Sequence, residues 1–119
     1  MQYDPAASRV QIYGDFALPI TQAAADGAVT PKGGVAFITK GSAAALTLAA
    51  PIPGADDGKS LTFIAATAFA HVLTCPTDGF NAKGASGTAT LAAAVGNGLT
   101  VTAFNGHWYA SGAAGCTIA

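Results

Sequence analysis

The feature that most constrains the fold is a segment near the end of the chain, residues 99–112, which reads LTVTAFNGHWYASG. Runs of alternating apolar and polar residues flank the dipeptide Asn105-Gly106. This dipeptide is the strongest short-range signal for a β-hairpin, because both loop positions of a type I′ turn require positive φ. The segment therefore predicts two antiparallel strands, residues 99–104 and 107–111, joined by a two-residue turn.

A two-residue loop also fixes which residues face each other, and side chains alternate between the two faces of a strand. One face should carry Trp108 above the small Ala103 and join the core. The other should carry Phe104, His107 and Tyr109, and we expect Phe104 and Tyr109 to make subunit contacts. A slip by one residue would expose the tryptophan and bury several threonines, so the register should be firm. The predicted pairs are Phe104 with His107, Ala103 with Trp108, Thr102 with Tyr109, and Val101 with Ala110.

The composition favours a single small β-rich domain. The chain has 119 residues, enough for one domain with a modest core. Alanine dominates its 51% hydrophobic content and offers little area to remove from water. All the acidic residues are Asp, a turn residue, and none is the helix former Glu. We therefore expect an all-β protein whose monomer is marginally stable and gains stability from oligomer or partner contacts.

The charge pattern excludes two classes of partner. Charged residues make up 9% of the chain, and its basic residues are spread singly, so a nucleic-acid surface is not expected. After Lys83 the chain has no charged residue, but repeated glycines, asparagines and threonines interrupt it, so no membrane span is expected. The N-terminus has no basic region before an apolar one, so we expect no signal peptide.

The chain divides into two parts by pattern. Residues 1–34 read as an extended arm with little core of its own, containing one short alternating strand at 9–13 and one helical turn at 21–25. Residues 35–119 read as a small antiparallel β-sandwich or barrel-like domain, because short strands alternate with frequent turn signals. Further strands are expected at 35–39, 43–49, 60–66, 70–75 and 115–118, and residues 88–95 are ambiguous between helix and strand.

A weak internal repeat lies within this β domain. Residues 58–65 have the pattern Gly-x-x-Leu-Thr-Phe-x-Ala, and residues 96–103 have Gly-x-x-Leu-Thr-Val-x-Ala. Residues 46–49, Leu-Thr-Leu-Ala, echo both. The repeat indicates either a duplicated motif at the start of a strand or a coincidence in a chain rich in alanine and threonine.

The residues that could carry chemistry do not assemble into a catalytic site. A catalytic triad needs a nucleophile and a carboxylate near a histidine, and no Asp lies near His71 or His107 in the sequence. We expect His71 to be a hydrogen-bonded structural residue and His107 to face solvent. Cys75 and Cys116 lack CxxC spacing and read as two small buried thiols, with a disulfide or a metal site shared with the histidines as the less favoured alternatives.

The glycine-rich and acidic loops indicate turns and no ligand site. Asp56-Asp57 faintly suggests a calcium loop, but the closing Glu of an EF-hand is absent, so a turn is expected. No Gly-Lys-[Ser/Thr] follows the later glycines, so no phosphate loop is expected. We therefore predict no catalytic residue, cofactor or metal, and no enzyme activity.

Residues 58–112 resemble a pattern of small structural proteins of tailed bacteriophages, especially capsid decoration (cement) and head-fibre proteins. The ordered motifs are Gly58-Lys59-Ser60-Leu61-Thr62-Phe63, then Thr67-Ala68-x-Ala70-His71-Val72-Leu73-Thr74, Gly79-Phe80-Asn81, Gly96-Asn97-Gly98-Leu99-Thr100 and Phe104-Asn105-Gly106-His107-Trp108-Tyr109. The resemblance covers about half of the chain, and its specificity comes from the order of the motifs.

This resemblance implies a β-rich, non-enzymatic virion protein. Such a protein is made in the bacterial host cytoplasm, sits on the capsid exterior as a small homo-oligomer, with a trimer favoured, and binds the major capsid protein to stabilise the head. Apolar residues of the arm that lack an obvious core are expected to carry the capsid contact: Tyr3, Val10, Ile12, Tyr13 and Phe16. The Gly-Leu-Thr and Asn-Gly-x-Trp-Tyr motifs also resemble tail-fibre and spike modules, so the alternative is a fibre module that binds a host receptor or glycan.

Overall fold

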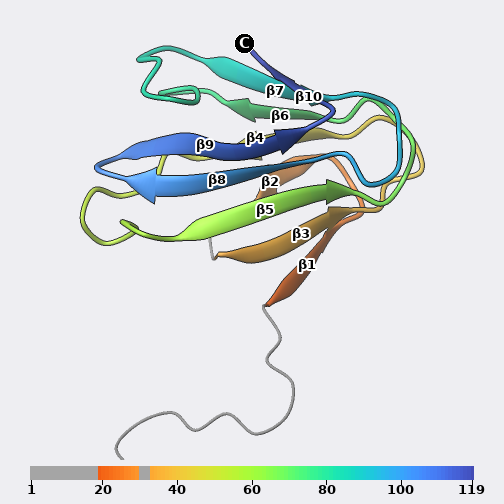
Figure 1. The fold of residues 1–119 in the computed structure, drawn as a ribbon, viewed down its shortest axis with the longest axis horizontal. Coiled ribbons are helices and arrows are strands. Elements are labelled where there is room, and N and C mark those ends of the chain that lie inside the picture. The colour runs from red at the N-terminus through yellow and green to blue at the C-terminus, as the bar shows by residue number, and fades with distance from the viewer. Residues whose placement is uncertain (1–18, 30–32) are drawn as a thin grey trace, which may run out of the picture.

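The structure is a computed structural model, and it describes residues 19–29 and 33–119. The described part of the chain contains ten strands, which turns and loops connect (Figure 1). The predicted capsid-contact residues Tyr3, Val10, Ile12, Tyr13 and Phe16 lie outside the described residues. The strands are β1 (Ile20–Ala23), β2 (Gly27–Val29), β3 (Gly34–Ile38), β4 (Ala45–Leu48), β5 (Ser60–Ala65), β6 (Val72–Cys75), β7 (Gly87–Leu91), β8 (Gly98–Phe104), β9 (His107–Ala114) and β10 (Cys116–Ile118).

The strands form two packed five-stranded sheets, which confirms the all-β sandwich (Figure 1). Sheet A has the order β1-β3-β5-β8-β9, and sheet B has the order β10-β7-β6-β4-β2. Both sheets are mixed rather than purely antiparallel. The predicted antiparallel arrangement fails because β1 to β6 are joined by connections that cross between the sheets, and such crossovers bring strands back parallel.

The first six strands form a flattened coil. Along the chain they alternate between sheet A and sheet B, and each of β1 to β4 pairs in parallel with the strand two positions later, which lies in its own sheet. The last four strands, β7 to β10, then add antiparallel to this coil. The fold is therefore a three-turn coil of parallel strands completed by antiparallel ones.

The domain begins earlier than the sequence indicated. Strands β1 and β2 lie within the segment predicted to be an arm, and β1 replaces the predicted helical turn at 21–25. The parallel ladder with β3 supplies backbone hydrogen bonds to this alanine-containing segment, such as the 2.9 Å bond from Val35 N to Pro19 O. Helix propensity is a weak prior, and the tertiary pairing overrides it here.

The weak repeat forms one structural unit. Strands β5 and β8, which carry its two copies, pair antiparallel with Thr62 opposite Thr100. The same hydrogen bond closes the pairing at both ends, from the first glycine of one copy to the last alanine of the other. Gly58 N donates to Ala103 O at 2.8 Å, and Gly96 N donates to Ala65 O at 2.8 Å. A backbone atom of Phe63 lies so close to Gly98 that a side chain there would collide with it. The two copies therefore meet around an approximate two-fold axis.

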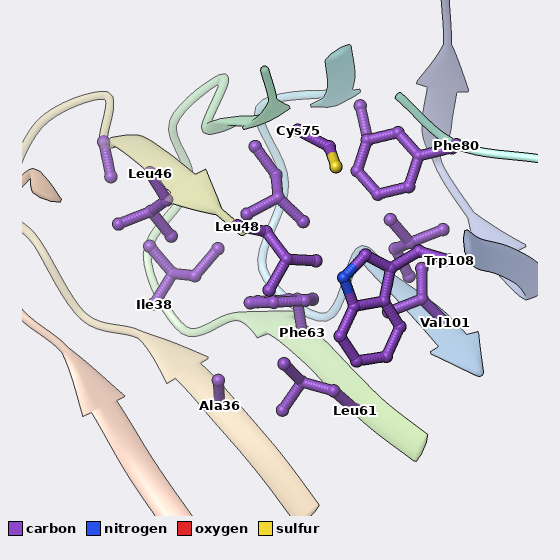
Figure 2. Close-up of a cluster of buried hydrophobic side chains, with 14 of the residues drawn as sticks. Ala36, Ile38, Leu46, Leu48, Leu61, Phe63, Cys75, Phe80, Val101 and Trp108 are labelled. Carbon is purple, nitrogen blue, oxygen red and sulfur yellow. The ribbon is translucent and has the colours of Figure 1, made fainter. Parts of the chain in front are cut away.

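The core lies between the two sheets and combines a few large side chains with many alanines. Every second residue of β5 and β8 is buried, which is the period that strands impose. Trp108, Phe63 and Leu48 are fully buried and lie together in Figure 2. Ala36, Ala65, Ala89 and Ala103 are also buried, so the sheets approach through small side chains. The strand predicted at 43–49 is confirmed over the four residues of β4. The segment 88–95, which was ambiguous between helix and strand, is strand up to the end of β7 at Leu91.

His71 is the structural residue that the sequence predicted. Its side chain is fully buried, and Nδ1 accepts a 2.9 Å hydrogen bond from Ala44 N. Nε2 therefore carries the ring proton, and it lies 3.0 Å from Oγ1 of Thr67, which donates in turn to Lys40 O at 2.7 Å. This chain of bonds ties the connection between β3 and β4 to the connection between β5 and β6.

Candidate functional site

The candidate site is built on the β8–β9 hairpin, whose predicted register is confirmed. The structure pairs Phe104 with His107, Ala103 with Trp108, Thr102 with Tyr109 and Val101 with Ala110. Asn105 and Gly106 have φ of 51° and 82°, as a type I′ turn requires. An irregularity at Thr100/Val101 then shifts the pairing, so that Thr100 lies opposite Gly112. The hairpin thus holds Phe104, His107 and Tyr109 on the face away from the core.

Trp108 anchors the hairpin to the rest of the molecule. Its side chain is fully buried, and Nε1 donates a 2.9 Å hydrogen bond to Ala49 O beyond the end of β4. On the free side of β9, Phe80 forms an isolated bridge with Trp108. One residue therefore connects sheet A, sheet B and the loop between β6 and β7.

The loop between β6 and β7 covers the first half of the β9 edge. Asn81 N donates to Trp108 O at 2.8 Å, and Ala110 N donates to Asn81 Oδ1 at 2.9 Å. Asn81 and Ala82 have φ of 60° and 56°, a region that residues other than glycine rarely occupy. The two bonds to β9 hold this loop in its unusual conformation and place Asp78 beside the hairpin.

Asp78 and His107 form a carboxylate–imidazole pair that the sequence did not reveal. Asp78 Oδ2 lies 2.6 Å from His107 Nδ1, and the ring of Tyr109 meets that of His107 edge-on at 6.0 Å. His107 was expected to face solvent, but its side chain is only 32% exposed. No local signal could have found this pair, because 29 residues separate its members and only the docked loop brings them together.

This pair lacks the third member of a hydrolytic triad. In the described part of the chain, no hydroxyl or thiol is hydrogen-bonded to the His107 ring. Among residues 19–29 and 33–119, no group of three or more His, Cys, Asp or Glu side chains could hold a metal ion. The arrangement can accept and donate hydrogen bonds at the surface, which suits recognition of a polar group.

The two cysteines are separate free thiols. Cys75 is fully buried in the core at the end of β6, and Cys116 is half-buried at the start of β10. Burial raises the pKa of both thiols, and this disfavours the reactive thiolate. Their positions agree with structural roles.

The Asp56-Asp57 loop is a turn, as predicted, and it docks on the hairpin. Asp56 accepts hydrogen bonds of 2.8 Å from Ile52 N and from Lys59 Nζ. Asp57 Oδ1 accepts a 2.8 Å bond from Asn105 N at the hairpin tip. The carboxylates therefore hold the connection between β4 and β5 against the β8–β9 turn.

Two carboxylates, Asp26 between β1 and β2 and Asp56 between β4 and β5, should make the fold sensitive to acid. Hydrogen bonds from Lys40 and from Ala45 N lower the pKa of Asp26, and hydrogen bonds from Ile52 N and Lys59 lower the pKa of Asp56. A carboxyl group with a lowered folded-state pKa stabilises the fold above its unfolded-state pKa, and the gain is lost as the pH falls through the folded-state value. We expect the thermal midpoint to fall below about pH 4.

The measurement is the thermal midpoint between pH 6 and pH 2, compared with that of the double variant Asp26→Asn/Asp56→Asn. The variant should melt at a lower temperature at pH 6, and its thermal midpoint should fall less steeply between pH 6 and pH 2. If the thermal midpoints of the two proteins fell by the same amount over this pH range, the role given to these carboxylates would be contradicted.

The outer face of sheet A extends from this site across the sheet. None of its outward-facing strand positions in the described residues is Asp, Glu, Lys or Arg. Hydroxyl pairs run across it, with Thr62 Oγ1 3.0 Å from Thr100 Oγ1 and Ser60 Oγ 3.3 Å from Thr102 Oγ1. Phe104 and Tyr109 lie at its hairpin end, 61% and 38% exposed. We call this surface the outer A face; its members are Ile20, Gln22, Val35, Phe37, Ser60, Thr62, Ile64, Gly98, Thr100, Thr102, Phe104, His107, Tyr109, Gly112 and Ala114.

No protein-family model matches the chain, and no curated protein shows significant similarity to it. Among the residues described, no helix is long and apolar enough to cross a membrane.

Proposed function

We propose that this protein is a structural component of a tailed-bacteriophage virion, a capsid decoration (cement) protein that binds the outer surface of the major capsid protein lattice. The ordered motifs between residues 58 and 112 suggest this class. In this role the protein acts by binding and not by catalysis. It assembles as a small homo-oligomer, with a trimer favoured, and is located on the capsid exterior.

The outer A face is the observation that carries the assembly of subunits in this proposal. Cores of protein–protein interfaces are depleted in charged residues and enriched in aromatic ones, and this face shows both properties. Half-buried Val35, Phe37 and Ile64 continue the uncharged surface away from the hairpin. Phe104 and Tyr109 are the subunit contacts in this proposal, and the capsid contact belongs to the segment before β1.

A charge placed in the middle of this face should disrupt assembly. Thr100 lies at the centre of the outer A face, between Thr62 and Gly112. In Thr100→Asp, a subunit contact would bury an unpaired carboxylate, at a cost of about 3–5 kcal/mol. We expect the wild-type protein to be oligomeric by light scattering and Thr100→Asp to be monomeric. Thr47→Asp is the matched control, because Thr47 is an exposed threonine on β4 in sheet B.

The capsid role is tested on virus particles. An antibody raised against the protein should label the heads of the virus that encodes it. Heads stripped of the protein should rebind the wild type but not a variant lacking residues 1–18, whose β-type circular dichroism should persist. Absence of label on the heads would overturn the capsid proposal. An unchanged mass for Thr100→Asp would overturn only the role of the outer A face.

The second candidate, a fibre module that binds a glycan, is favoured by the surroundings of Tyr109. Exposed aromatic rings can stack on the apolar face of a sugar ring, and the Asp78–His107 pair offers hydrogen-bonding groups to its hydroxyls. Binding on a glycan array that disappears in Tyr109→Ala would support this candidate. An array with no binding would remove it.

A further inference from the structure

Both sheets end on the same side of the molecule, at the first turn of the coil. Strand β1 is the edge of sheet A, and β2 is the edge of sheet B (Figure 1). On the opposite side of sheet A, the loop between β6 and β7 covers part of β9 through Asn81. Natural proteins commonly protect exposed edge strands with charges, proline or covering loops. The strands β1 and β2 read ITQA and GAV and contain no charged residue or proline.

Within residues 19–29 and 33–119, the outer edge of β1 presents backbone groups that have no hydrogen-bond partner. Val35 N donates to Pro19 O at 2.9 Å, and Thr39 N donates to Ala23 O at 3.0 Å. In a parallel ladder alternate residues bond to the neighbouring strand, so residues 19, 21 and 23 face β3. The N–H and C=O groups of Ile20 and Gln22 therefore point away from sheet A. They form a template for one more strand.

A cavity of about 380 Å³ lies between the two edge strands. Its floor is formed by Ala36 of β3 and Leu46 of β4, and its walls by the residues from Thr21 to Val29. Four wall residues align with buried neighbours: Thr21 lies beside Ala36, Ala23 beside Ile38, Gly27 beside Leu46 and Val29 beside Leu48, and none of the four is larger than valine. The space between the two sheets is therefore not filled by large side chains at this edge.

The one acidic side chain that lines this cavity among the described residues, Asp26, is neutralised internally. Asp26, in the turn between β1 and β2, pairs with Lys40 at 2.8 Å and also accepts a 2.8 Å bond from Ala45 N. The part of this edge that the structure describes therefore offers backbone hydrogen bonds and an apolar floor without net charge. Such a surface complements an uncharged extended chain.

We propose that this edge binds an extended segment of a partner protein, which adds a strand to β1 and inserts one large apolar side chain between the sheets. The segment pairs with Ile20 and Gln22 through its backbone and carries no charged side chain facing the cavity. A residue of the size of Leu or Phe would occupy the space above Ala36 and Leu46. A second copy that pairs through its own β1 fits less well, because its small Thr21 would leave the cavity unfilled. This proposal does not rest on the capsid role.

The test uses the full chain and a display library of random nine-residue peptides. Gln22→Pro removes an edge N–H and obstructs an incoming strand without removing a bond to β3, and Gln22→Thr is its matched control because it keeps the N–H. Thr21→Leu fills the cavity while the edge stays open, and Thr21→Val is its control with little added volume.

We expect the wild-type protein to enrich peptides in which every second residue is uncharged and one of these residues is large and apolar. Their affinity should fall at least tenfold in Gln22→Pro and Thr21→Leu and stay within twofold in the two controls, with all four variants folded by circular dichroism. Failure to enrich such peptides, or equal binding by Gln22→Pro, would overturn the proposal. A dimer of the wild type that Gln22→Pro dissociates and Gln22→Thr leaves intact would also overturn it, because a second copy would then occupy the backbone edge.

Discussion

Replacing Trp108 by alanine is expected to lower the free energy of unfolding by about 3–5 kcal/mol. The indole is fully buried between the sheets, and its loss opens a large cavity beside Phe63 and Leu48 (Figure 2). The variant also loses the hydrogen bond from Nε1 to Ala49 O. Domains of this size have about 5–15 kcal/mol of stability in total, so much of the fold's margin would disappear. Urea unfolding followed by circular dichroism measures the change, since the chain has one tryptophan and the variant has no such fluorescence.

Two further variants separate packing from hydrogen bonding at this position. Trp108→Phe keeps most of the ring but leaves Ala49 O without its donor, at an expected cost of about 1–3 kcal/mol. Tyr109→Ala truncates the next residue, which points to the opposite face and is 38% exposed, and its effect should be much smaller. If Tyr109→Ala cost as much as Trp108→Ala, the assignment of the two faces of β9 would be wrong.

Replacing His71 by alanine is the second change with a large expected effect, a loss of about 2–4 kcal/mol from a cavity and an unsatisfied buried amide. Ala44 N would lose its acceptor, and Thr67 Oγ1 its neighbour at 3.0 Å. Two connections that cross between the sheets would then be joined less firmly. Thermal and urea unfolding measure the loss of stability.

The conservative variant His71→Asn tests whether the hydrogen bond or the volume matters more. The side-chain oxygen of asparagine can accept the bond from Ala44 N in the place of Nδ1. We expect His71→Asn to recover at least half of the stability lost in His71→Ala. Equal stability of the two variants would show that the acceptor does not contribute measurably.

The local features were predictable because each depends on neighbouring residues. Asn105-Gly106 determined the type I′ turn, and the turn determined the register that places Trp108 over Ala103. The alternating residues of β5 and β8 determined which side chains are buried. The turn role of Asp56 and the structural role of His71 followed from residue chemistry, and both are confirmed by their hydrogen bonds.

The candidate site was predictable only in part. The sequence placed Phe104, His107 and Tyr109 on one face, since strand periodicity alone decides it. It did not indicate the Asp78–His107 pair or the covering of β9 by Asn81, because both depend on a loop that is distant in sequence. The expected contact residues of the arm lie outside the described residues, so their role stays a prediction.

The sequence by itself determined the all-β class, the hairpin, its register and the alternation of buried residues, because these arise from turn chemistry and strand periodicity. The tertiary structure alone decided the parallel coil of β1 to β6, the inclusion of β1 and β2 in the domain, and the open edge beside the cavity. These features depend on which strands meet after the chain has crossed between the sheets. Such long-range pairings, for example Thr21 with Ala36 and Thr47 with Thr74, leave no pattern in neighbouring residues.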